Sequence, residues 1–378
     1  MRLISMILAL MLLLSLSIPA GAAEVLPETP PAPTEPPAPA ETPAPTETPA
    51  PSETPAPAET FAPTETPTPA EKPEDESFTI DLSIVGDCML ATYKGGYYKG
   101  SFSWYAANKD PSYFLEKVKP VFEADDFTIA NLETVLTDRK LTETPKKGER
   151  VFWFKGPASN AKILTSGSVE AVSLANNHTG DYGEAGRKDT IAAVEAAGLK
   201  YGNNDNTFVL EKNGFKIAVI CHGLWSEWQA NEIIPRIKKW SELSDYQIVF
   251  YHGGKESAHK PEDWRVRASR KLVDAGADLV IGNHPHVLQP REVYHGAEIV
   301  YSLGNFCYGG HSHPENRTII YKMLLTVDKG QVTKQESSLI PCYVYTGGTN
   351  NWQPAPLTDP AARQKVLDFM AWNRNLPY

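Results

Sequence analysis

Cysteine is scarce in this sequence: four occur in 378 residues, Cys88, Cys221, Cys307 and Cys342. None of them forms a Cys-x-x-Cys pair, so their spacing defines no cysteine motif. Four cysteines permit three disulfide pairings, and the spacing selects none of these. Disulfides and buried free thiols therefore both remain open.

An excess of charge of one sign is also missing from most of the chain. Residues 24–76 hold twelve acidic side chains and one lysine, whereas residues 77–378 hold 34 basic and 34 acidic side chains. The net charge of −10 therefore comes from the N-terminal stretch. Because residues 77–378 are neutral overall, we expect no nucleic-acid partner and no electrostatic attraction to an anionic membrane.

The N-terminus carries an apolar run, Leu3 to Ile18, between Arg2 and the small residues that end at Ala23. This pattern predicts a signal peptide over residues 1–23. The run is shorter than the roughly 20 residues that cross a bilayer, and an uncleaved membrane anchor is the alternative. Both interpretations predict a secreted or cell-surface protein, with membrane attachment only if the segment is retained.

Residues 24–76 have almost no large apolar side chain and hold 17 of the 32 prolines, in repeats close to Ala-Pro-Thr-Glu-Thr-Pro. Such a segment cannot form a core, so we predict a disordered linker rich in Pro, Thr and Glu. In a polyproline-II geometry of about 3.1 Å per residue it would reach about 160 Å.

Residues 77–378 alternate apolar segments typical of strands with amphipathic segments, which predicts one α/β domain. Five predicted strands end in polar side chains. The predicted strands are 78–85, 127–130, 171–174, 215–220, 248–251, 279–281 and 299–301, with a hairpin of 319–327 and 331–340; the predicted helices are 184–197 and 262–275.

Because functional groups gather at strand ends in α/β proteins, we expect the polar side chains there to share one site. Mixed oxygen and nitrogen donors suit manganese, zinc or iron and argue against calcium, so we predict one or two divalent metal ions. Two such ions would polarise a phosphoryl oxygen and acidify a bound water. The predicted ligands are Asp87, Glu133, Asn177, His252, His284 and His286.

Two local patterns add to this hypothesis. In His284-Pro285-His286, a proline-stiffened extended turn can direct both imidazoles into one cleft. His178, next to Asn177, can serve as a general acid, because imidazole titrates near neutrality. The alternative for Asn177 and His178 is that they only hydrogen-bond the turn before the next helix.

Six ordered motifs between about residues 80 and 306 resemble the CapA-type capsule synthesis proteins associated with poly-γ-glutamate, within the calcineurin-like metallophosphoesterase superfamily. The motifs are Gly86-Asp87, Asn131-Leu132-Glu133, Leu174-Ala175-Asn176-Asn177-His178, His252-Gly253-Gly254-Lys255-Glu256, Gly282-Asn283-His284-Pro285-His286 and Ser302-Leu303-Gly304-Asn305-Phe306.

The resemblance implies a four-layer α/β/β/α sandwich with a dimetal site. In it, Asp87 and His286 would hold the first metal, and Glu133 would bridge both. The second metal would be held by Asn177, His252 and His284, and His178 would be the proton donor.

The chain departs from the wider superfamily pattern at two points. Asp-x-His becomes Asp87-Cys88-Met89, and Glu133 stands where the superfamily has a bridging Asp. A thioether does not replace imidazole toward a hard ion, so we expect a depleted first metal site. We expect Cys88 to point to the opposite face of its strand from Asp87.

Other histidines and tryptophans keep two interpretations each. His222 supports the site or lies in the core. For His311 and His313 we expect a solvated loop, and a role in the site is the alternative. Trp225 and Trp228 line a substrate groove or pack in the interior.

Together these features predict an exported capsule-synthesis type protein, a metal-dependent hydrolase of a phosphoester or amide related to the capsule or cell envelope. Its partner would be a capsule or cell-wall polymer or its precursor. The alternative is a non-catalytic, polymer-handling or accessory subunit of capsule synthesis or export, with a degraded metal site.

Overall fold

Two β-sheets face each other in the computed structural model, which describes residues 77–148 and 151–378. The predicted signal peptide and linker lie outside these residues. Among the described residues the first sheet has the order β16-β15-β14-β1-β2-β5-β6, and β13 pairs with β1. Its strands are β1 (Phe78–Met89), β2 (Phe127–Leu132), β5 (Ala171–Ser173), β6 (Lys200–Gly202), β13 (Asn305–Tyr308), β14 (Thr318–Asp328), β15 (Gln331–Tyr343) and β16 (Ala355–Pro356).

The second sheet has the order β11-β12-β10-β9-β8-β7. Its inner strands β8, β9, β10 and β12 run parallel, so their carboxyl ends meet at one edge. The bounds are β7 (Thr207–Lys212), β8 (Phe215–Gly223), β9 (Tyr246–His252), β10 (Leu279–Asn283), β11 (Leu288–Tyr294) and β12 (Ala297–Leu303); a small separate pair consists of β3 (Val135–Leu136) and β4 (Lys155–Gly156).

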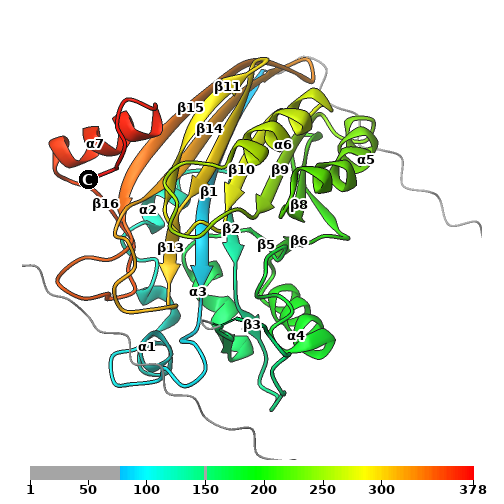
Figure 1. Ribbon diagram of the computed structural model, residues 1–378. Coiled ribbons are helices and arrows are strands. Elements are labelled where there is room, and N and C mark those ends of the chain that lie inside the picture. The colour runs from blue at the N-terminus through cyan, green and yellow to red at the C-terminus, as the bar shows by residue number, and fades with distance from the viewer. Residues whose placement is uncertain (1–76, 149–150) are drawn as a thin grey trace, which may run out of the picture. The chain divides into compact units, whose positions relative to one another are not determined.

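Helices cover the outer faces of both sheets. The helix α5 packs on β8 and β9, and α6 packs on β10 and β12, whereas α3 and α4 join the core of the first sheet (Figure 1). The helices are α1 (Phe102–Asn108), α2 (Lys119–Phe122), α3 (Ala161–Ser166), α4 (Gly183–Ala196), α5 (Ala230–Ser241), α6 (Asp263–Asp274) and α7 (Pro360–Met370), with 3₁₀ turns at Pro111–Tyr113, Ala158–Asn160 and Glu227–Gln229.

The alternation of side chains along each strand produces the layers. On β9, Ile248 and Phe250 enter the core between the two sheets, while Val249 enters the core under α5 and α6. On the first sheet, Ile129 faces the inner core and Ala130 the outer one. The molecule is therefore the four-layer α/β/β/α sandwich that was predicted.

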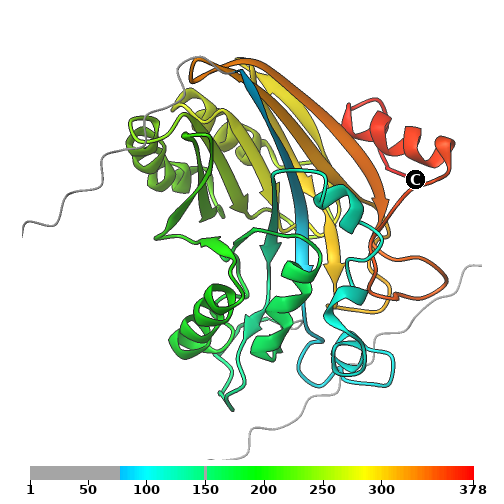
Figure 2. The ribbon, with the colours of Figure 1, turned by 180° about the vertical axis from the view of Figure 1, so that it is seen from behind.

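The helix α7 closes one side of this sandwich. Its buried residues Val366, Phe369 and Met370 belong to the core between the sheets. In both views it lies on the opposite side of the molecule from α5 and α6 (Figures 1 and 2).

The predicted elements match most observed ones closely. The predicted helices 184–197 and 262–275 correspond to α4 and α6, with one residue of difference at each end. The predicted strand 78–85 continues to Met89, because Asp87 and the residues around it still pair with β2 and β13. Sequence reasoning missed α5, which contains Pro235.

The chain passes from the second sheet to the first at Gly304, between β12 and β13. Here the backbone N–H of Asp87 donates to the carbonyl of Gly304 at 3.0 Å. A Cβ on Gly86 would lie 1.9 Å from that carbonyl oxygen, so a side chain cannot be accommodated. This close approach accounts for the glycine before Asp87 and holds the end of β1 beside the second sheet.

The four cysteines are buried free thiols. Burial raises the pKa of the Cys88 and Cys221 thiols to about 12, so both stay protonated at neutral pH. The free-thiol interpretation therefore describes this structure.

No helix within residues 77–148 and 151–378 has both the length and the apolar character that crossing a bilayer requires.

Candidate metal centre

The six predicted ligands meet at one point between the two sheets. The two carboxylates and the amide come from the first sheet, and the three imidazoles come from the second. Asp87 lies on β1, Glu133 follows β2, Asn177 follows β5, His252 ends β9, and His284 and His286 follow β10.

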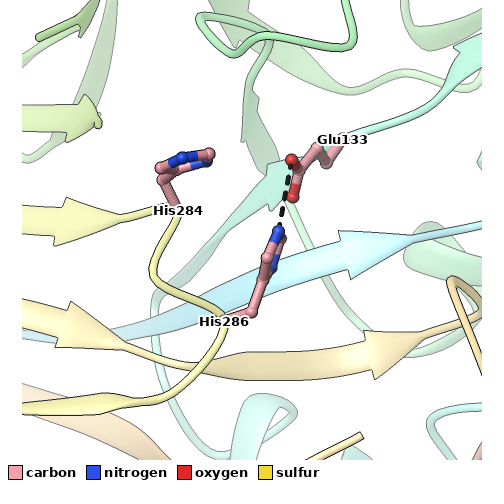
Figure 3. A group of neighbouring side chains, drawn as sticks. All are labelled: Glu133, His284 and His286. Atoms are coloured by element: carbon pink, nitrogen blue, oxygen red, sulfur yellow. Dashed lines mark ion pairs between the residues drawn. The ribbon is translucent and has the colours of Figure 1, made fainter. Parts of the chain in front are cut away.

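Short distances join the acids and the imidazoles. His286 Nδ1 lies 3.1 Å from Asp87 Oδ2, and His252 Nε2 lies 3.4 Å from Glu133 Oε1. Figure 3 shows His286 pointing toward Glu133, where Nε2 and Oε1 are 3.9 Å apart. Glu133 with His284 and His286, and Glu133 with Asp87 and His252, each form a group whose donor atoms lie within 4.8 Å of one another.

The remaining two predicted ligands join the same cluster through His252. Its Nε2 lies 2.8 Å from Asn177 Oδ1 and 3.1 Å from His284 Nδ1. All six side chains therefore belong to one connected cluster.

The loop after β10 has an unusual backbone at both histidines. His284 has a φ of 94° and His286 a φ of 59°, values that cost about 1–3 kcal/mol each for residues with a side chain. The loop is held by the N–H of Ser257, which donates to the Pro285 carbonyl at 2.8 Å, and by the N–H of His284, which donates to Asp87 Oδ2 at 3.3 Å. Left-handed backbone, and not the predicted extended turn, directs both imidazoles inward.

Glu133 is the clearest sign that a cation belongs here. It is fully buried, and neither carboxylate oxygen accepts a hydrogen bond from any described residue. Asp87, by contrast, accepts hydrogen bonds from Asn131 Nδ2 at 2.7 Å and from the His284 backbone. A buried carboxylate without donors is costly unless a positive charge compensates it, and a divalent ion among these donors would do so.

The cluster shifts the pKa values of two of its histidines in opposite directions. Burial opposes charge on His286, but the carboxylates of Glu133 and Asp87 outweigh it and raise the pKa of His286 to about 10. Burial, with the neighbouring rings of His252 and His286, lowers the pKa of His284 to about 2. In the metal-free cluster, His284 is therefore neutral, the state in which imidazole binds a metal.

His178 lies at the edge of the cluster, and Asp181 orients its ring. Its Nδ1 lies 2.9 Å from Oδ2 of the fully buried Asp181, and its Nε2 lies 3.8 Å from Glu133 Oε1. Asp181 also accepts from the Phe154 N–H at 2.7 Å and pairs with Lys146 Nζ at 2.5 Å. With Nδ1–H held by Asp181, Nε2 is the nitrogen that faces the cluster.

A cleft of about 500 Å³ opens over Asn177 and His178. Lys146, Lys147 and Glu256 bring charged groups to it. The cluster is therefore reachable by a substrate from the side of the proposed acid.

Sequence reasoning missed three residues that support the cluster. Asn131 Nδ2 lies 3.2 Å from His252 Nδ1 besides its bond to Asp87, and Asn305 Oδ1 lies 3.0 Å from His286 Nδ1. Both asparagines are at strand ends, the same signal that identified the ligands. Asp181, in a turn after Asn177, carried no comparable signal.

The departures from the superfamily pattern have visible consequences. Met89 is buried in an apolar group with Phe154 and Tyr308, and the Thr134 hydroxyl donates to its sulfur at 3.4 Å. No imidazole stands at this position. Cys88 packs in the outer core of the first sheet, as predicted.

The ambiguous aromatic and histidine positions are now placed. His222 is buried and contacts the Gly223 carbonyl and Glu232, outside the cluster. His311 and His313 are exposed in a loop, as predicted, and His311 also lines a pocket beside His286. Trp225 is 43% exposed, and its ring lies 4.9 Å from that of His284, so it forms a wall of the site.

Comparison with known proteins identifies the family of the chain. Residues 81–309 match the model of the bacterial capsule synthesis protein family PGA_cap. The chain is 27% identical to the PGA biosynthesis protein CapA of Bacillus subtilis over 76% of both chains. It is also 27% identical to the capsule biosynthesis protein CapA of Bacillus anthracis, over 75% of this chain and 68% of that protein.

Among solved structures, a novel phosphatase from Mycoplasma pneumoniae is similar at 15% identity and a TM-score of 0.40, over 70% of this chain and 95% of that chain. A hypothetical protein from Thermus thermophilus is similar at 14% identity and a TM-score of 0.43, over 69% and 99% of the two chains. Since the family model covers more than half of the sequence, the chain belongs to the PGA_cap family of bacterial capsule synthesis proteins.

Proposed function

We propose that this protein is an exported, metal-dependent hydrolase that cleaves a phosphoester or amide in a capsule or cell-wall polymer or its precursor. One observation carries the proposal: the buried carboxylate of Glu133 accepts no hydrogen bond from a described residue and faces imidazoles from the opposite sheet. Such a carboxylate is suited to hold one ion or to bridge two. The capsule-related substrate is inferred from the family and its named relatives.

In this proposal, different residues hold the metal, donate a proton and bound the substrate. Asp87, Glu133, Asn177 and the three imidazoles would hold the metal, which when bound polarises the scissile group and lowers the pKa of water. His178 would donate a proton from Nε2 to the leaving group, because Asp181 holds its Nδ1 on the far side. Trp225 on one side and the lysine-lined cleft on the other would bound the substrate.

The second candidate is a non-catalytic accessory subunit that binds polymer. Met89 favours it, because the position of a metal-binding histidine in the superfamily is filled here by a side chain in an apolar cluster. Replacing it by Met89→His distinguishes the two candidates. An accessory protein would bind more metal without turnover, whereas a hydrolase would gain turnover as well.

The test of the leading proposal combines metal content with hydrolysis. The purified protein would be loaded with Mn²⁺, Zn²⁺ or Fe²⁺ and assayed on bis-p-nitrophenyl phosphate and on a γ-glutamyl amide. We expect His284→Ala to lose metal. We expect Asp181→Asn to keep metal but lower kcat by about 10- to 100-fold, with a shifted pH profile, because the proton on His178 moves to the wrong nitrogen.

Bound metal without turnover on either class of substrate would contradict the hydrolase. Unchanged kcat in Asp181→Asn would contradict only the role of His178.

A further inference from the structure

A second pocket, of about 250 Å³, opens on the His286 side of the cluster. Three aromatic rings line it, from Phe152, Phe154 and Tyr308, together with the carboxylates Glu256 and Glu315 and the imidazoles of His178, His286 and His311. Neither lysine nor arginine occurs among the described residues of its lining, in contrast to the lysine-lined cleft. The two recesses share Phe152, His178 and Glu256, whereas Lys146 and Lys147 line only the cleft and Glu315 lines only this pocket.

The most informative group in this pocket is the Tyr308 hydroxyl. The side chain is 7% exposed, and its hydroxyl makes no hydrogen bond to any described residue. A Cβ on Gly310 would lie 2.4 Å from this oxygen, so the loop after β13 bends closely around the phenol.

The two carboxylates also lack partners on the pocket side. Glu315 Oε2 pairs with His259 Nε2 at 2.9 Å, while its buried Oε1 accepts no hydrogen bond from a described residue. Glu256 is exposed at the mouth and forms no ion pair within residues 77–148 and 151–378. Each of the two carboxylates therefore keeps at least one oxygen without a partner among the described residues.

We propose that this pocket binds a protonated primary amine of the substrate, with Glu256 and Glu315 as its acceptors and the Phe152, Phe154 and Tyr308 rings around it. The pocket's relation to a reacting bond rests on the proposed function. Aromatic rings attract an ammonium group by their negative faces, and carboxylates add charge-assisted hydrogen bonds.

The two carboxylates disfavour an anion beside them, because a phosphate or carboxylate there would face two negative charges. His286, whose pKa is raised to about 10 in the metal-free cluster, is the cationic group of the lining and belongs to the cluster itself. A substrate would therefore place its amine near Glu256 and Glu315 and its anionic part toward Lys146 and Lys147. This arrangement fits a polymer unit that carries a free amino group next to the bond at the cluster.

The experiment measures binding and needs no turnover. The full-length protein, loaded with metal, would be titrated with n-butylammonium and with n-butanol, a neutral ligand of matched shape, by ligand-observed NMR. We expect the amine to bind at least about tenfold more tightly than the alcohol. Glu256→Gln and Glu315→Gln should each weaken amine binding by about five- to tenfold, with no change for the alcohol.

Two further variants make the result specific. Phe152→Leu, at a 45% exposed ring, should weaken amine binding by about two- to fivefold. Glu211→Gln, at an exposed carboxylate on β7, is the matched control and should bind like the wild type.

The proposal would be overturned if the amine and the alcohol bound equally well, or if neither Glu256→Gln nor Glu315→Gln changed the affinity for the amine. A protein that binds the amine but hydrolyses nothing would contradict the hydrolase and leave the amine subsite standing.

Discussion

The substitution Glu133→Gln tests the metal centre most directly. The carboxylate is fully buried and faces His252, His286 and His178 at 3.4 to 3.9 Å, and no described donor satisfies it. Glutamine has nearly the same volume, so the change removes the charge and leaves the packing. A neutral amide cannot bridge two ions and is a weaker ligand for one.

The magnitude follows from linkage between metal binding and folding. An ion present at 100 times its Kd stabilises the folded state by about 2.7 kcal/mol, and at a concentration equal to Kd by about 0.4 kcal/mol. Loss of groups that only support metal ligands weakens affinity by about 10- to 100-fold, so loss of this central carboxylate should cost at least about 100-fold. For a domain of this size, the metal-dependent rise in Tm should fall from about 5 °C to about 1 °C.

The assay is thermal unfolding with and without Mn²⁺ or Zn²⁺ at one fixed concentration, beside elemental analysis of the dialysed protein. Glu211→Gln serves again as the control and should retain the full rise in Tm. If Glu133→Gln kept the wild-type rise in Tm and the wild-type metal content, Glu133 would not be a ligand and the centre as described would be wrong.

Two predictions concern stability. Gly254→Ala should lower the free energy of unfolding by about 3 kcal/mol, because its φ is 110° and a Cβ would lie 2.2 Å from Nη1 of the buried Arg265; Gly198→Ala, with a φ of 82° and open space, should cost only about 1 kcal/mol. Equal urea midpoints for the two variants would contradict this difference. Burial raises the pKa of Glu170 to about 7, so the folded state binds its proton more tightly than the unfolded state, and stability falls as pH rises from about 4.5 through 7. Glu170→Gln should match the wild type near pH 4 and exceed it at pH 8 in urea unfolding, whereas the same pH slope in both proteins would contradict the assignment.

Much of the centre could be predicted because a single signal marks it: a polar side chain directly after an apolar strand. That signal located Asp87, Glu133 and His252 in sequence, and parallel pairing then places strand ends together. It also applied to Asn131 and Asn305. Both belong to the six motifs, but no role of their own was predicted for them.

Other features depend on contacts that sequence spacing does not contain. The left-handed backbone of His284 and His286 is imposed by hydrogen bonds from distant segments, and proline between them suggested an extended turn instead. Asp181 follows no strand, and its role appears only when the turn brings it behind His178. The helix α5 was not predicted. It contains Pro235, a residue that disfavours a helix interior, and burial of Ile233 and Ile237 sustains it.

The division of the ligands between the sheets has a mechanical consequence. Acids and amide sit on one layer and imidazoles on the other, so a bound ion would act as a cross-link across the interior. Any slip of one layer past the other would then stretch the coordination bonds. A larger or smaller side chain between the layers, for example at Phe250, would therefore change the affinity for the ion, even though Phe250 is not a ligand.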